Sequence, residues 1–165
     1  MHIFAINMAE ALILKEGTKA EQYESLLPQI RGVIGGESNL IANLANTTAM
    51  LREQFNWWWV GFYLVDSQKE LVLGPFQGPL ACTRIKKGKG VCGGAWQQEK
   101  TLIVPDVEDF PGHIACSGAS RSEIVVPIIR KGEVVAVLDV DSEHLNHFDE
   151  TDQQFLEQMV TMIPF

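Results

Sequence analysis

The stretch SEIVVPIIRKGEVVAVLDVDS, residues 122–142, decides the fold class. It contains two strongly apolar runs, residues 124–129 and 134–140, which are rich in the β-branched side chains that favour strands. The polar, glycine-containing residues 130–132 separate the two runs, so we predict a β-hairpin. Strands that are apolar on both faces usually lie between two layers. We therefore predict one α/β (α+β) domain, a mainly antiparallel sheet with helices on both faces.

Four more strands and a short helix are predicted in the middle of the chain. Residues 57–65 are rich in aromatic and β-branched side chains, and a polar break leads to the apolar residues 71–73, which indicates a second hairpin. The residues that follow are expected to form, in order, a turn-rich stretch (74–79), a short strand (81–85), a basic loop (86–90), a helix (91–98), a strand (101–104) and an irregular segment (105–118).

Two helices are predicted in the part of the chain before residue 57. Apolar side chains at helical spacing favour helices over residues 18–34 and 40–55. Pro28 must either kink or divide the first of these, because it lacks a backbone N–H. Ser38 or Asn39 is available to cap the start of the second. Both helices are expected to cover the sheet.

The two ends of the chain are also predicted to be helical. Thr151 and Gln154 have the spacing of a capping box, and the apolar residues that follow predict a closing helix. Residues 1–14 are fairly apolar and are interpreted as a terminal helix. They are too short to span a membrane and lack the basic flank and cleavage site of an export signal.

Composition and net charge argue against some classes of function. The chain has 165 residues, of which 46% are hydrophobic and 21% charged, as in an ordinary single globular domain. Its net charge of -8 at pH 7 opposes binding to nucleic acid or to an anionic membrane surface. We therefore expect no nucleic-acid or membrane partner. Because residues 1–14 do not have the pattern of an export signal, we also expect a cytoplasmic protein, whose cysteines meet a reducing environment.

The three cysteines are the first candidates for chemistry. Cys116 stands in the small-residue loop HIACSG, where a thiol can stay accessible, although a simply buried cysteine is the alternative. Cys82 and Cys92 flank the basic residues of a segment that could move toward Cys116 and favour their thiolate forms. This arrangement indicates disulfide exchange. Three cysteines and His113 could instead hold zinc, but no Cys-x-x-Cys pair is present, so no metal site is expected.

An acidic cluster is the second candidate. Asp139 and Asp141 alternate along one strand and therefore share a face, where solvated charges at a strand end are the alternative interpretation. A three-residue hairpin loop would place Glu123 opposite Asp139. A two-residue turn would place Glu123 on the other face, unless Pro127 marks a bulge that restores the register. The sequence leaves these alternatives open.

Aromatic residues on another strand suggest a pocket. Trp59, Gly61 and Tyr63 alternate, so one face carries two rings separated by a glycine gap. Packing in the core is the commoner use of such rings. The pattern therefore allows either a shallow apolar pocket or a core position.

Several short motifs together resemble one known family. They are VGFY (60–63), LGPFQG (73–78), GHIAC (112–116), SEIVVP (122–127) and LDVDS (138–142). These motifs are similar to those of the free methionine-R-sulfoxide reductases, which are stand-alone GAF domains, and the resemblance runs from Glu37 to Met162. We therefore expect a GAF domain over residues 37–165 and, over residues 1–36, a helical segment that packs on the body or on a partner subunit.

The resemblance implies roles for the cysteines. Cys116 would be the nucleophile, Cys82 the recycling cysteine, and Cys92 a third cysteine that substitutes or relays. The family forms dimers and draws electrons from thioredoxin or another dithiol, with no bound cofactor. The expected partners are therefore free methionine sulfoxide, thioredoxin and a second copy of the chain.

The resemblance also implies roles for the other candidate residues. Glu123, Asp139 and Asp141 would bind the ammonium group and the sulfoxide oxygen of the substrate, while Trp59 and Tyr63 would enclose its methyl group. The reaction needs an acid at the oxygen that leaves sulfur, and clustered carboxylates supply one, for which Asp141 is the candidate. A ligand-binding module without turnover and a redox sensor are the competing hypotheses.

Overall fold

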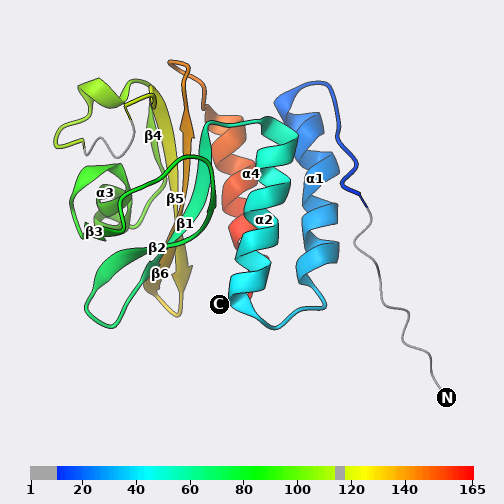
Figure 1. The fold of residues 1–165 in the computed structure, drawn as a ribbon, viewed down its shortest axis with the longest axis horizontal. Coiled ribbons are helices and arrows are strands. Elements are labelled where there is room, and N and C mark those ends of the chain that lie inside the picture. The colour runs from blue at the N-terminus through cyan, green and yellow to red at the C-terminus, as the bar shows by residue number, and fades with distance from the viewer. Residues whose placement is uncertain (1–10, 114–117) are drawn as a thin grey trace.

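The computed structural model describes residues 11–113 and 118–165. Figure 1 shows how the helices and strands of this part of the chain are arranged. The elements in chain order are α1 (Lys19–Ile34), α2 (Leu40–Phe55), β1 (Trp59–Val65), β2 (Glu70–Gln77), β3 (Arg84–Lys86), α3 (Gly90–Gln98), β4 (Leu102–Val104), the 3-10 helix η1 (Val107–Asp109), β5 (Ser122–Arg130), β6 (Glu133–Ser142) and α4 (Glu150–Val160).

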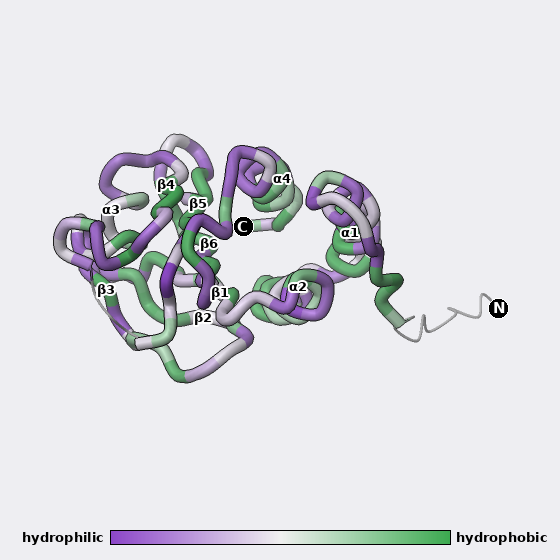
Figure 2. The backbone as a smooth tube through the Cα atoms, turned by 90° about the horizontal axis from the view of Figure 1, so that it is seen from above, coloured by the Kyte–Doolittle hydropathy of each residue, from purple (hydrophilic) through white to green (hydrophobic). Residues whose placement is uncertain are grey.

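The strands form one six-stranded sheet in the order β3-β2-β1-β6-β5-β4. Each neighbouring pair is antiparallel. Helices α2 and α4 pack on one face, α1 lies on their outer side, and α3 covers the other face (Figures 1 and 2). This arrangement confirms the predicted α+β class with helices on both faces.

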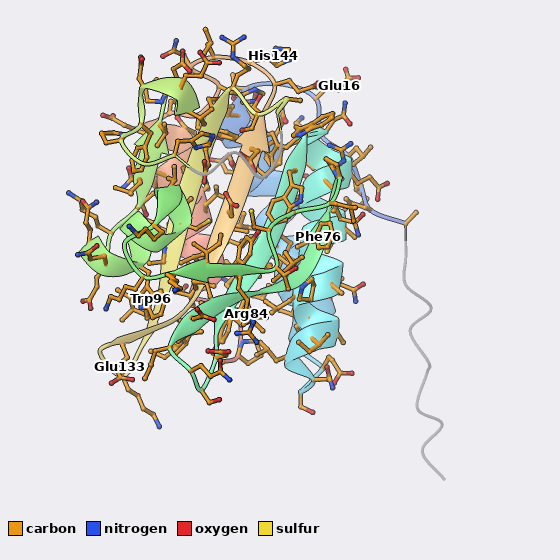
Figure 3. The ribbon with its side chains drawn as sticks, turned by 60° about the vertical axis from the view of Figure 1, so that its left-hand side comes forward. Glu16, Phe76, Arg84, Trp96, Glu133 and His144 are labelled. Carbon is orange, nitrogen blue, oxygen red and sulfur yellow. The ribbon has the colours of Figure 1, made fainter. Side chains whose placement is uncertain are left out.

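The sheet separates two apolar cores. The larger core lies under the three-helix layer and receives side chains such as Val60, Ile124 and Leu138 from the sheet. The smaller core lies under α3 and receives the alternate positions, such as Val125 and Val137. Figure 3 turns this second side toward the viewer and labels Phe76 of β2 and Trp96 of α3, which belong to it. Burial on both faces explains why the central strands are apolar throughout.

The β5–β6 hairpin turns through two residues, and a bulge follows the turn. Lys131 and Gly132 have positive φ angles of 52° and 82°, as a tight hairpin turn of this length requires. The pairing then shifts, so that Val135 of β6 has no opposite residue. Of the two turns that the sequence left open, the structure therefore has the two-residue turn and not the three-residue loop. A bulge does restore the register, but it lies at Val135 and not at Pro127.

Strand β2 is longer than predicted, because residues 74–77 continue the strand. The register of β1 and β2 shifts between Gly61 and Tyr63, which leaves an extra residue in the Gly74–Pro75 region of β2. A bulge tolerates proline, which cannot donate to the ladder, and β3 pairs only with the first part of β2. The proline that predicted a turn therefore lies inside a strand.

The helix boundaries agree with those predicted from the sequence, except near the two ends of the chain. Helix α1 runs through Pro28 as one element and is not divided. Asn39 caps α2 by accepting a hydrogen bond from the N–H of Ala42. The capping box of α4 is formed by Asp149 and Asp152, so the predicted box at Thr151 and Gln154 is wrong by two residues. The carboxylate two residues upstream is the stronger cap.

The predicted terminal helix over residues 1–14 is not present where it can be observed. Residues 11–14 are not helical, and residues 1–10 lie outside the described part. Gln29 of α1 instead bonds both the N–H and the C=O of Ile13, which fixes this segment against the helix. Helix α1 shares its core with the rest of the domain, and the division at residue 37 stays a prediction. Among the described residues, no helix is long and apolar enough to cross a membrane.

Candidate active site

Three carboxylates of the β5–β6 hairpin lie on the face that α3 covers. In the observed register Glu123 is opposite Asp141, and Val125 is opposite Asp139. Alternate positions share a face, so all three carboxylates project to the same side of the sheet. The structure therefore brings these residues together, although Glu123 faces Asp141 and is diagonal to Asp139. The bulge near the turn produces this register.

The carboxylates line a pocket. The free volume of this pocket, including the part that is open to solvent, is about 530 Å³. Seven of the residues singled out in the sequence line it, namely Trp59, Tyr63, Cys92, His113, Glu123, Asp139 and Asp141. Strand β1 contributes the two rings, α3 the thiol and the hairpin the acids. The pocket therefore joins an apolar wall to an acidic floor.

Burial and mutual repulsion raise the pKa values of the acidic cluster. Loss of solvation raises the pKa of Glu123 well above its ordinary value, and the charges of Asp139 and Asp141 raise it further. Burial also raises the pKa of Asp139, with Asp141 adding to the effect. Burial raises the pKa of Asp141 to about 6, against the opposing hydrogen bond from Ser120. Burial and mutual repulsion thus both favour the protonated form of these carboxyl groups.

One oxygen of the cluster has no hydrogen-bond partner in the described part of the chain. It is Oδ1 of Asp139, a side chain that is only 7% exposed. A buried carboxylate oxygen without a donor is costly. Asp139 lines the pocket, and a cationic or hydrogen-bonding group of a ligand that reached this oxygen would satisfy it.

The aromatic wall is closely packed. The Trp59 ring stacks on Tyr63 with centroids 6.0 Å apart and on Phe76 with centroids 5.4 Å apart. A Cβ atom at Gly61 would overlap the Trp59 ring and the Phe76 side chain. The predicted glycine gap is therefore filled by the indole ring of Trp59, which lies over Gly61 and forms part of the apolar wall of the pocket.

Both rings also hold the neighbouring segment that carries Cys82. Trp59 Nε1 donates a hydrogen bond to the carbonyl of Pro79 at 3.1 Å. The hydroxyl of Tyr63 donates to the carbonyl of Cys82 at 2.9 Å. These bonds fix the backbone on both sides of Ala81, which lines the pocket. The aromatic wall thus positions a cysteine-bearing segment at the rim of the site.

The cysteines differ in their surroundings. Cys92 lies in α3, is 3% exposed, and its Sγ donates to Oε1 of Glu123 at 4.0 Å. Burial, then the charges of Asp139 and Glu123, raise the pKa of the Cys92 thiol. The expectation that positive charge favours the thiolate form of Cys92 is therefore wrong, because an acidic cluster and not the basic loop surrounds this thiol. Cys116 lies outside the described residues.

Three further pocket residues had no predicted role in binding the substrate. Lys89, His113 and Ser120 line the pocket, and Ser120 Oγ donates to Oδ1 of Asp141 at 2.6 Å. In the sequence, His113 was only a candidate zinc ligand, Lys89 belonged to the basic loop, and Ser120 had no signal beyond its closeness to Gly118. The partner of a loop serine depends on how the loop folds back, which local sequence does not specify.

Comparison with known proteins shows the domain family to which the chain belongs. Residues 42–163 match the GAF domain family, and the chain belongs to that family. It is 66% identical over 156 residues to GAF domain-containing protein A of Dictyostelium discoideum, covering 94% of this chain and 99% of that protein.

The relatives with named activities define the group within the class. The free methionine-R-sulfoxide reductase of Escherichia coli is 44% identical over 146 residues, covering 88% of each chain. The crystal structure of the Neisseria meningitidis free methionine-R-sulfoxide reductase in complex with its substrate superposes with a TM-score of 0.91 at 55% identity, covering 93% of this chain and 92% of that one. Within the GAF family, the chain thus groups with the free methionine-R-sulfoxide reductases.

Proposed function

We propose that this chain, an oxidoreductase, reduces free L-methionine-R-sulfoxide to methionine. The observation that carries the proposal is the buried acidic cluster, whose pKa values are raised, in one pocket with an aromatic wall. Such a pocket suits a zwitterionic substrate with a cationic end, an apolar methyl group and an oxygen that must accept a proton. We propose no bound cofactor.

The acidic floor recognises the ammonium group. Glu123 and Asp139 are buried, and Oδ1 of Asp139 has no partner among the described residues. An ammonium group supplies three donors and one positive charge, which relieves the repulsion between the carboxylates. Methionine sulfoxide within a peptide lacks that charge. The pocket therefore selects the free amino acid.

Asp141 is the proton donor to the sulfoxide oxygen. A pKa of about 6 leaves it partly protonated near neutral pH, the range in which a general acid is most useful. The hydrogen bond from Ser120 fixes the orientation of its carboxyl group. Trp59 and Tyr63 enclose the methyl end and so direct the oxygen toward the acid.

The thiol chemistry proceeds in two steps. The thiolate of Cys116 attacks the sulfoxide sulfur, the S–O bond breaks, and with a proton from the acid the oxygen passes to Cys116 as a sulfenic acid while methionine leaves. The thiol of Cys82 then attacks that sulfenic sulfur, a disulfide forms and water is released. Thioredoxin or another dithiol reduces the disulfide. In support, Cys82 is not a free thiol in the structure, whereas Cys92 is.

The surroundings in which the enzyme acts are part of the same proposal. A dithiol-recycled enzyme needs a reducing compartment, so we place it in the cytoplasm. We also propose that it is a homodimer. Sedimentation of the purified chain tests the second statement.

A second candidate function is a sensor that binds the ligand without turnover. A solved structure described as a putative GAF sensor protein from Burkholderia vietnamiensis is 46% identical and superposes with a TM-score of 0.86, covering 89% of this chain and 94% of that one. The acidic pocket would bind methionine or its sulfoxide equally well in such a protein. Turnover therefore distinguishes the two functions.

The test is steady-state turnover with a dithiol as reductant. The parent chain should reduce free methionine sulfoxide, and N-acetylated methionine sulfoxide should react far more slowly. Cys116→Ser should abolish methionine release, while Cys82→Ser should release one methionine per chain and then stop. Binding of the sulfoxide without any release of methionine would establish the sensor instead. Normal recycling in Cys82→Ser but not in Cys92→Ser would move the recycling role to Cys92.

A further inference from the structure

We propose that Cys92, Glu123 and Asp139 form a site for a soft divalent cation, such as Zn²⁺ or Cd²⁺, at the floor of the pocket. The three residues come from α3, β5 and β6 and are all buried. Binding of the ion does not depend on the proposed function. Its consequence does, because an ion at this place would exclude the ammonium group of the substrate and inhibit the enzyme.

The distances between donor atoms suit a single ion. One ligand atom from each residue lies within 4.8 Å of the other two. Cys92 Sγ and Glu123 Oε1 are 4.0 Å apart. Around tetrahedral zinc, bond lengths of about 2.3 Å to sulfur and about 2.0 Å to oxygen give a sulfur–oxygen separation of roughly 3.5 Å. Small rotations of the side chains close this difference.

An unpartnered oxygen points to a missing positive charge. Oδ1 of Asp139 has no hydrogen-bond partner among the described residues, in a side chain that is 7% exposed. No ion pair in the described part of the chain includes Cys92, Glu123 or Asp139. A divalent cation would satisfy this oxygen and compensate the repulsion within the cluster, whereas an ammonium group brings only one charge.

The donor set selects soft cations. A thiolate ligand favours zinc and cadmium, while magnesium and calcium prefer sites made of oxygen alone. The thiol of Cys92 loses its proton to solvent when the ion binds, as a metal-bound cysteine does. Cys92 thus acquires a role that differs from disulfide exchange: it is the residue that makes the acidic floor attractive to soft metals.

The experiment measures Cd²⁺ binding to a variant in which Cys92 is the only thiol. In the full chain carrying Cys82→Ser and Cys116→Ser, Cd²⁺ is titrated and the ultraviolet charge-transfer band of the cadmium–thiolate bond is recorded. The proposal predicts saturation at one ion per chain, displacement by Zn²⁺ and no displacement by Mg²⁺. Addition of Cys92→Ser should abolish the band.

Two carboxylate variants complete the test. Asp139→Asn in the same background should weaken Cd²⁺ binding by roughly a hundredfold, since even groups that only orient a ligand are worth about 10–100-fold. Asp149→Asn removes an exposed carboxylate that pairs with Lys19 and should leave the affinity unchanged. No cadmium–thiolate band, or equal affinity in the Asp139 variant and its control, would overturn the proposal.

Competition with methionine separates this inference from the proposed function. If methionine displaces Cd²⁺, both ligands use the same carboxylates and both proposals are supported. If Cd²⁺ binds as predicted and methionine does not displace it, the metal site stands and the assignment of Glu123 and Asp139 to the ammonium group is wrong. If Cd²⁺ does not bind while turnover is normal, only the metal site is refuted.

Discussion

Replacing Asp141 by asparagine should stabilise the fold while it impairs catalysis. Burial raises the pKa of Asp141 from 3.8 to about 6. Between these values the folded chain holds a proton that the unfolded chain has released, so stability falls as pH rises through this range. Each pKa unit corresponds to about 1.4 kcal/mol, and the ionised side chain therefore destabilises the fold by about 3 kcal/mol at neutral pH.

The assay is urea unfolding followed by tryptophan fluorescence at several pH values. Asp141→Asn keeps the shape and can still accept the hydrogen bond from Ser120, but it carries no charge. Its free energy of unfolding should match that of the parent near about pH 4 and exceed it by up to about 3 kcal/mol near about pH 7. Methionine formation should slow by roughly a hundredfold or more, as losses of a general acid usually do.

A matched variant, Asp149→Asn, should change the free energy of unfolding in the opposite direction. Partial burial acts to raise the pKa of Asp149. The hydrogen bond and charge of Lys19, together with the backbone N–H groups of Thr151 and Asp152, hold this pKa below its ordinary value. Asp149→Asn should therefore destabilise the fold at neutral pH, and the difference should disappear as pH falls through the folded pKa. Equal unfolding free energies for Asp141→Asn and the parent at every pH would refute the claim that burial holds a proton on Asp141.

Three further substitutions test the geometry of the pocket. Tyr63→Phe removes the hydrogen bond to the carbonyl of Cys82. It should slow steady-state turnover roughly fivefold, which corresponds to a lost hydrogen bond of about 1 kcal/mol, and leave the first burst of methionine unchanged, so a slower burst would contradict this role. Ser120→Ala removes the hydrogen bond that lowers the pKa of Asp141, so the alkaline limb of the kcat profile should move to higher pH, and an unchanged limb would count against that bond. Gly61→Ala would push a methyl group into the neighbouring indole ring and should lower the unfolding free energy by about 1–3 kcal/mol with a raised KM; an unaltered KM would show that the ring does not form the pocket wall.

Composition and periodicity predicted most of the fold, because the apolar pattern directly reports which faces are buried. The hairpin at residues 122–142 and the helices at 18–34 and 40–55 appear with small changes at their ends. The turn predicted over residues 74–77 was wrong. Pro75 taken alone indicates a turn, and a strand tolerates it here only because β2 has a bulge where it pairs with β1.

The candidate site was harder to predict, because it depends on register and on burial. The choice of face for Glu123 rested on one extra residue in a hairpin, and Val135 carries no local signal of a bulge. The chemistry of Cys92 was misjudged for a similar reason. Its neighbours in sequence are basic, whereas its neighbours in space are Glu123 and Asp139, and the spatial neighbours determine its pKa.

The most direct test of the reductase proposal is a single-turnover measurement on the reduced chain without external reductant. Each sulfur epimer of free methionine sulfoxide is mixed with excess enzyme, and released methionine is measured over time beside a Cys116→Ser control. The account predicts release of methionine from the R epimer, none from the S epimer and none with the control. Equal release from both epimers, release by the Cys116→Ser chain, or tight binding of the R epimer with no methionine formed would contradict it.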